Sequence, residues 1–238
     1  MPTTTPDDPA DTRMMGVVHS ALRRDLVRLL IVIRSEPQPD DARRVAVADH
    51  LLWMMDFLHH HHRGEDDGLY PLVVSKNADA EPLVREMDAE HAAVAPAISS
   101  VEAAARAYRD SSDARPSVLE ALDTLREVLL PHLEREEVEM MPVVSASISA
   151  AEWSAWDQAT NVKPKGLRQL GMEGHWLIDG ADAANRARVV GLVPPVPRFV
   201  LLHGFAPSYR RRTTRLWGGT RAADVPSLGL DVLAQWTP

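Results

Sequence analysis

Cysteine is absent from the 238 residues of the chain. Its absence excludes a disulfide framework and thiolate metal ligands. Any metal site must therefore use imidazole and carboxylate groups, which are donors that iron, manganese and zinc accept. Aromatic residues are also scarce, at 5%, and no stretch alternates apolar and polar residues as a half-buried strand does. The sequence therefore predicts an all-α protein.

Long apolar runs and an export signal are missing as well. The longest aliphatic run, residues 29–33, is too short to cross a bilayer. The first residues, MPTTTPDDPADTR, contain neither the basic nor the apolar segment of a signal peptide. We therefore expect a cytoplasmic protein without a membrane partner.

Basic side chains are few in the first part of the chain. Residues 1–150 carry 15 basic and 27 acidic side chains, and residues 151–238 carry 11 and 7, within a total net charge of −8. Because phosphate contacts need clustered Lys and Arg, no nucleic-acid partner is expected. The opposite charges of the two parts predict that the second part packs across the first or makes a subunit contact, such as a homodimer interface.

Four segments space their apolar residues three and four positions apart, as amphipathic helices do. Four helices of similar length joined by short linkers predict an antiparallel up-down-up-down four-helix bundle over residues 12–148. Residues 1–11 are expected to be disordered before it. Pro96 and Pro131 are expected to kink the third and fourth helices, and Pro142 to end the fourth. The four segments cover residues 12–34, 40–66, 82–108 and 116–140.

Residues 149–238 are expected to form a helical extension that packs on the bundle. Ser149 followed by Glu152 has the pattern of a helix N-cap. A further helix is expected over residues 198–217, with Phe199 among its apolar residues. The apolar periodicity is too weak to predict that this part folds alone. The remaining features of this part are interpreted as structural or solvated: His175, His203 and the arginines at 210–212 and 215.

Every predicted bundle helix carries a histidine on its apolar stripe, and two of the helices repeat a pair. In both pairs a His precedes a Glu by four positions and a Pro by ten. Residues four apart project to the same side of a helix, so each pair offers two adjacent donors. In antiparallel helices all these donors reach one layer of the bundle. The predicted metal ligands are His19, His61, Glu65, His91, His132 and Glu136.

Burying four imidazoles and two carboxylates without partners would destabilise the domain by several kcal/mol per group. A bound pair of metal ions removes that cost. The ordered set resembles the hemerythrin family, and more closely its cation-binding branch with the pattern His, His-x-x-x-Glu, His, His-x-x-x-Glu, over residues 12–148. The resemblance implies two iron ions joined by an oxo or hydroxo bridge, rather than manganese or zinc. It also implies that the four histidines are terminal ligands and that Glu65 and Glu136 bridge the irons.

The chain departs from the oxygen-carrying hemerythrins, which it resembles but which hold their irons with more histidines. His62 or Tyr70 could supply a further ligand, or one coordination position stays open. The departure makes reversible oxygen carriage the least expected function. Of the other histidines, His59 and His60 are interpreted as solvated or as outer neighbours of the ligands, and His50 as structural.

Two other metalloprotein classes fit the sequence less well. Ferritin-like di-iron proteins use Glu-x-x-His pairs and more carboxylates than imidazoles, which is the reverse of the ratio here. Zinc proteases need His-Glu-x-x-His, which is absent. Three further acidic residues of the fourth helix, Glu134, Glu137 and Glu139, are interpreted as a solvated face rather than as ligands.

The resemblance leaves three functions open, and the sequence identifies no catalytic residue. In the first, a di-iron site reacts with a small molecule, O2, hydrogen peroxide or NO, with catalase-like peroxide removal favoured. In the second, the protein binds or senses O2, NO or iron without turnover. In the third, the bundle is structural and its metal affinity is adventitious.

Overall fold

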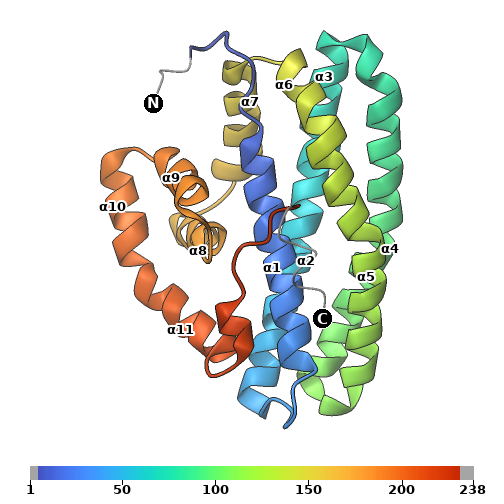
Figure 1. Cartoon of the computed structure of the whole chain (residues 1–238), viewed down its shortest axis with the longest axis vertical. Coiled ribbons are helices and arrows are strands. Elements are labelled where there is room, and N and C mark those ends of the chain that lie inside the picture. The colour runs from blue at the N-terminus through green and yellow to red at the C-terminus, as the bar shows by residue number, and fades with distance from the viewer. Residues whose placement is uncertain (1–4, 231–238) are drawn as a thin grey trace.

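The computed structural model describes residues 5–230, and within them the chain forms helices and no strand. The predicted all-α class is therefore confirmed. Four long helices lie side by side: α1 (Arg13–Ile33), α2 (Asp41–Gly64), α4 (Glu81–Asp110) and α5 (Arg115–Arg135). In Figure 1 the chain descends along α1, returns along α2, descends along α4 and returns along α5. α4 packs against both α2 and α5, and α1 packs against α5.

The apolar stripes of the sequence form the core between these helices. Representative fully buried positions are Leu51 and Leu58 in α2, Ile98 in α4, and Leu122 and Leu125 in α5. The exposed faces of α2, α4 and α5 are polar, as expected for helices that bury one stripe. α1 differs, because 17 of its 21 residues are buried. It is covered by the bundle on one side and by the C-terminal part of the chain on the other (Figure 1).

The second and fourth helices extend further than the sequence predicted. α2 continues through a five-residue π-helical segment, η1 (Glu65–Leu69), into α3 (Tyr70–Lys76). α5 continues in the same way through η4 (Glu136–Met140) into α6 (Met141–Ser147). The prediction that Pro142 ends the fourth helix is therefore wrong.

The two π-helical segments have a common cause. Pro71 and Pro142 lie in the first turns of α3 and α6. A proline ring clashes with the carbonyl four residues earlier and offers no N–H. The wider π turn avoids this conflict, because its hydrogen bonds span five residues instead of four. Tyr70 N–H thus donates to the Glu65 carbonyl, and Met141 N–H to the Glu136 carbonyl. Pro96 and Pro131 lie inside α4 and α5 without ending either helix.

The C-terminal part adds five helices, one π-helical segment and one short helical turn within the described residues. The helices are α7 (Ala150–Asp157), α8 (Leu167–Ile178), α9 (Ala183–Gly191), α10 (Pro195–Gly204) and α11 (Ala206–Trp217); the π-helical segment η5 (Gln158–Val162) follows α7, and the turn η6 (Arg221–Asp224) follows α11. Two short turns of the bundle, η2 (Ala78–Ala80) and η3 (Ser112–Ala114), precede α4 and α5. The expected capping box at Ser149 and Glu152 is present.

The prediction of a single helix over residues 198–217 is wrong. The chain forms α10 and α11 with Phe205 between them. Gly204 ends α10, and Pro207 stands in the first turn of α11, where a missing N–H is tolerated. Phe199 is 65% exposed and does not belong to the core.

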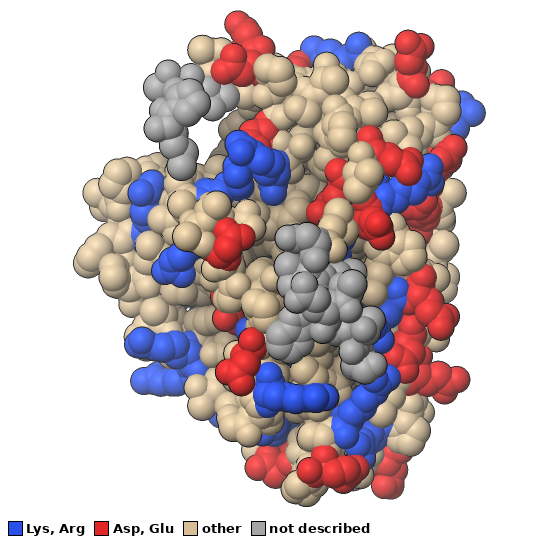
Figure 2. All heavy atoms as spheres, viewed as in Figure 1, with Lys and Arg blue, Asp and Glu red and all other residues tan. Residues whose placement is uncertain are grey.

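Trp176 of α8 and Leu216 and Trp217 of α11 belong to the same apolar core as the bundle helices. Acidic side chains gather on the face of the bundle formed by α4 and α5, at the right edge of Figure 2, and basic side chains lie over the C-terminal helices at the left. None of the helices in residues 5–230 combines the length and apolar character that crossing a membrane requires.

The N-terminal segment, expected to be disordered over residues 1–11, is ordered where the structure describes it. Ala10 N–H donates to the Ile148 carbonyl at 3.1 Å, and Ala150 N–H donates to the Asp8 carbonyl at 2.7 Å. Ala10 is also buried. These contacts hold the N-terminal segment against the connection between α6 and α7. No local sequence pattern predicts them. Residues 1–4 lie outside the described residues.

Candidate metal centre

Two groups of buried donor side chains lie next to each other in the bundle. The ligand atoms within each group lie within 4.8 Å of one another. One group contains His19, His61 and Glu136, and the other contains His62, His91 and His132. The structure thus brings together five of the six predicted ligands and adds His62.

In the first group, His19 Nε2 lies 3.3 Å from His61 Nε2 and 3.3 Å from Glu136 Oε2. In the second group, His91 Nε2 lies 3.2 Å from His132 Nε2. The His62 ring stacks on the His91 ring, with centroids 4.1 Å apart and planes 10° apart. Each group therefore gathers lone pairs around a small volume, as a metal ion requires.

The sixth predicted ligand, Glu65, lies between the groups. Its Oε1 is 3.3 Å from His61 Nε2, and its Oε2 is 3.7 Å from His91 Nε2. Glu136 also reaches both groups, because its Oε2 lies 3.3 Å from His19 Nε2 and 3.9 Å from His132 Nε2. Both carboxylates can therefore contact two cations at once.

The site contains buried carboxylate oxygens that no hydrogen-bond donor satisfies. They are both oxygens of Glu65 and Oε2 of Glu136, and both residues are 0% exposed. His62 Nε2 is likewise buried without a partner. Buried polar atoms are normally satisfied, so these orphaned atoms need an explanation. A pair of cations among them fits the donor chemistry, because it would satisfy the oxygens and the imidazole together.

The local fold explains the repeat in the sequence. His61 with Glu65 and His132 with Glu136 are four residues apart, and each Glu begins one of the two π-helical segments. Such segments occur frequently at functional sites, where they change the direction of side chains. The second and fourth helices therefore present equivalent pairs to the same space.

A second layer of carboxylates holds the imidazoles by their Nδ1 atoms. His19 Nδ1 lies 2.9 Å from Glu137, His91 Nδ1 lies 2.6 Å from Asp66, and His132 Nδ1 lies 3.0 Å from Glu90. A carboxylate that accepts the Nδ1 proton fixes the tautomer in which Nε2 carries a free lone pair, and it makes that lone pair more basic. The three histidines are thus oriented with Nε2 toward the centre.

These carboxylates were missed from the sequence, and the interpretation of Glu137 as part of a solvated face is wrong. Its side chain is 16% exposed and also pairs with Arg23 Nη1 at 2.7 Å. Glu134 and Glu139 are exposed, as expected. The sequence did contain a signal. Asp66 and Glu137 each directly follow a donor glutamate, and Glu90 directly precedes His91.

Tyr70 does not belong to either group of donors. Its hydroxyl donates a hydrogen bond to Glu136 Oε1 at 3.1 Å, and its side chain is buried. Burial and the neighbouring carboxylates Glu136 and Glu65 raise the pKa of Tyr70 well above its usual value, so the phenol keeps its proton. Tyr70 therefore positions the Glu136 carboxylate.

Burial and neighbouring charged groups together set the protonation of the donors. Burial lowers the pKa of His61 to about 3, and it lowers the pKa of His62 and His132 as well, so these imidazoles are neutral at pH 7. Burial and the repulsion of Glu136 raise the pKa of Glu65. Burial also opposes the charge of Glu136, but the neighbouring imidazole of His19 outweighs burial and lowers the pKa of that carboxyl.

The other histidines lie away from the two groups or face outward. His60 Nε2 donates to the Thr160 carbonyl at 3.0 Å, and His175 Nε2 donates to the Leu201 carbonyl at 3.2 Å. His50 is buried beside Asp25, at 2.8 Å. His203 packs against Phe199 at the exposed end of α10. These placements agree with the interpretation of His50, His175 and His203 as structural.

The fold and the site define an all-helical protein whose bundle carries buried histidine and glutamate groups able to hold metal cations. The chain belongs to the hemerythrin family: the family model of the hemerythrin HHE cation-binding domain matches residues 10–144. That match covers the bundle and all six predicted ligands. Comparison with curated proteins and with solved structures finds no match.

Proposed function

We propose that the two donor groups bind two iron ions in an up-down-up-down bundle, and that Glu65 and Glu136 bridge the ions. The observation that supports this proposal best is the position of Glu65. Its two oxygens face different donor groups, at 3.3 and 3.7 Å, and neither has a hydrogen-bond donor. A single metal ion in either group would leave one of these buried oxygens unsatisfied.

The two ions would have unequal surroundings. His19 and His61 serve one ion, whereas His62, His91 and His132 serve the other. The difference arises because His62 has no counterpart in the fourth helix, where Leu133 stands at the equivalent position. Because the group of His19 and His61 offers one imidazole fewer, an ion held there would leave room for a small ligand on that side of the site.

The proposed reaction is with O2, hydrogen peroxide or NO, and catalase-like removal of peroxide is the activity we favour. A pair of irons supplies the two electrons that peroxide disproportionation exchanges, in which one peroxide is reduced to water and a second is oxidised to O2. The chain surrounds the donors with apolar side chains: Leu69, Met87 and Met140, each four positions from a donor along its helix, are fully buried. The Tyr70 hydroxyl keeps its proton and donates it in a hydrogen bond to Glu136.

The test is oxygen evolution from hydrogen peroxide by the iron-loaded protein. The wild type should evolve oxygen, the His132→Ala variant should lose this activity, and the His175→Ala variant, changed outside the donor groups, should keep it. Undiminished oxygen evolution by His132→Ala would discard the peroxide reaction while leaving metal binding open to separate analysis.

A second function, sensing of O2, NO or iron without turnover, is favoured by one contact. The C-terminal part touches the turn that carries Glu65: Trp156 Nε1 donates to the Gly64 carbonyl at 2.9 Å, and Thr160 lies against Gly64. A change at the donors could therefore reach α7 and η5. Limited proteolysis of residues 149–238 with and without iron tests this function, and identical digestion patterns would contradict it.

A further inference from the structure

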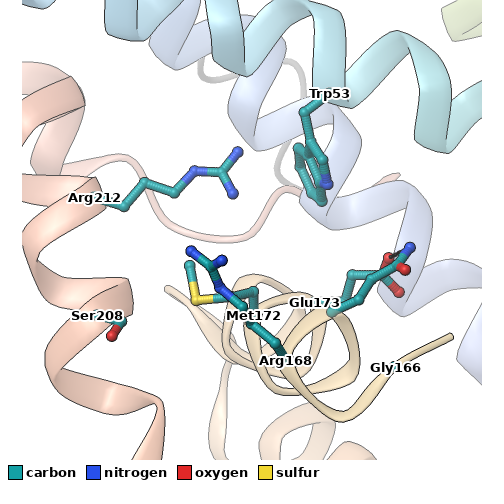
Figure 3. Close-up of a pocket in the computed structure, with 8 residues that line it drawn as sticks. Trp53, Gly166, Arg168, Met172, Glu173, Ser208 and Arg212 are labelled. Carbon is teal, nitrogen blue, oxygen red and sulfur yellow. Dashed lines mark hydrogen bonds between the residues drawn. The ribbon is translucent and has the colours of Figure 1, made fainter.

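A groove of about 580 Å³ lies between α2 and the C-terminal helices, apart from the donor groups. Trp53 forms one wall, Arg168 and Met172 of α8 form the floor, and Ser208 and Arg212 of α11 form the opposite wall. Figure 3 shows the side chains of Arg168 and Arg212 pointing into the same space, with the Trp53 ring beside it. The volume is in the range of small-molecule sites, roughly 300–1,000 Å³.

The groove carries two positive charges that no carboxylate neutralises within the described residues. Its one acidic residue, Glu173, is occupied, because it accepts hydrogen bonds from Lys165 at 2.7 Å and from Gln169 at 2.9 Å. Arg168 is exposed and has no ion pair or hydrogen bond in the part of the chain that the structure describes. The Lys165–Glu173 pair is neutral, so the groove presents a net charge of about +2 to a ligand.

Arg212 is held in place by groups that leave its charge available. Its Nη2 donates to His50 Nδ1 at 2.8 Å, and its guanidinium carbon lies 4.7 Å from the centre of the Trp53 ring. Neither partner is an anion, and a guanidinium presents further N–H donors in a rigid fork. A preordered arginine loses little side-chain entropy when it binds an anion.

A second depression continues this positive surface. Arg211 and Arg215 line it together with Arg212, and Trp53 and His50 lie on its other side. Its acidic residue, Asp49, is paired with Arg109 at 2.8 Å. The arginines of α11 therefore extend the field of the groove and would attract anions toward it.

The geometry points to a binding site for a small phosphate monoester with a flat organic group. A phosphate monoester carries a charge of about −1.5 to −2 at pH 7, which matches two arginines better than a single carboxylate does. Arg168 and Arg212 would bind its oxygens from two sides, with the Ser208 hydroxyl as a further donor. Trp53 and Met172 offer an apolar face to the organic group. The site requires no metal and is independent of the proposed iron chemistry.

Calorimetric titration of the full chain with phenyl phosphate and with inorganic phosphate tests the proposal. Phenyl phosphate should bind to the wild type. Loss of a charged hydrogen bond typically weakens binding by about tenfold or more, which is the effect expected for Arg168→Gln. Arg210→Gln, an exposed residue of α11 that does not line the groove, is the matched control and should bind within about twofold of the wild type.

Met172→Ala separates the two parts of the ligand. It should weaken the binding of phenyl phosphate and leave the weaker binding of inorganic phosphate unchanged, because Met172 offers only an apolar face to the organic group. Circular dichroism confirms that each variant is folded. Absence of phenyl phosphate binding to the wild type, or equal affinity of Arg168→Gln and Arg210→Gln, would overturn the proposal.

Discussion

Replacing Asp25 by asparagine should destabilise the protein far more than any surface substitution. Asp25 lies on α1, is 1% exposed, and accepts three hydrogen bonds of 2.8 Å. The donors are Arg24 Nε, Trp176 Nε1 and His50 Nε2. His50 carries its proton on Nε2 because its Nδ1 accepts from Arg212. One carboxylate thus connects α1, α2 and α8.

The magnitude follows from the charges left behind. Arg24 is 0% exposed and Arg28 is 2% exposed, and Asp25 is their nearest buried anion. Removing one partner of a buried ion pair typically costs about 3–5 kcal/mol, because the remaining charge is uncompensated. Arg24 keeps the carbonyls of Trp176 and Asp179, and Arg28 keeps the carboxylate of Asp179, which favours the lower end of that range.

Chemical denaturation followed by circular dichroism measures the effect. We expect Asp25→Asn to lower the free energy of unfolding by about 3 kcal/mol and the melting temperature by roughly 6–12 °C. The matched control is Asp123→Asn, which removes an exposed ion pair with Arg34 at 3.0 Å and should cost less than about 1 kcal/mol. Equal losses in the two variants would refute the argument that the Asp25 network joins the bundle to the C-terminal helices.

Three further predictions concern the site, its pH dependence and its contact with α7. Asp66→Asn should weaken iron binding by about 10–100-fold, since Asp66 orients His91, whereas Asp67→Asn on the exposed side should not; competition with a chelator measures both. Burial disfavours the charge of Asp25, but Arg24 and His50 outweigh burial and lower the pKa of Asp25 below its unfolded value near 3.8. The stabilisation from Asp25 should therefore be present above about pH 5 and decrease as the pH falls below about 5. Urea midpoints at several pH values should show a larger loss in the wild type than in Asp25→Asn, and equal losses would contradict the prediction. Gly64→Ala should destabilise the protein by about 1–3 kcal/mol, because the added Cβ would lie 2.5 Å from Thr160 Cγ2. Adding Thr160→Ser, which removes that methyl group, should recover the lost stability. Melting curves of the single and double variants would show both effects.

The bundle and its donor residues could be predicted because their signal is local. Apolar spacing along each helix shows which face is buried, and a histidine on that face points to the same interior as its neighbours. His19, His61, His91 and His132 were found in this way, and their Nε2 atoms now face the centre. His62 was harder to assign, because a position next to His61 turns about 100° around an ideal helix. It reaches the second group, beside His91 on α4, because that group lies on the neighbouring side of α2.

The features that the sequence did not reveal depend on contacts between distant segments. The role of Glu137 depends on α1, which brings His19 and Arg23 beside it. The continuation past Pro142 depends on a π turn that local propensity does not predict. The burial of α1 on both sides depends on residues 149–228, whose own apolar periodicity is weak. These three features depend on packing between segments far apart in the sequence, whereas apolar spacing and helix propensity predict only the individual helices.

We propose that the paired histidine and glutamate groups hold two metal ions, with Glu65 and Glu136 between them. Iron analysis of the purified chain, together with its near-ultraviolet absorption spectrum, tests it most directly. We expect close to two irons per chain and oxo-to-iron charge-transfer bands, and both should be lost in a Glu65→Ala, Glu136→Ala double variant that remains folded. A single tightly bound iron, no transition metal at all, or full iron content in the double variant would contradict it.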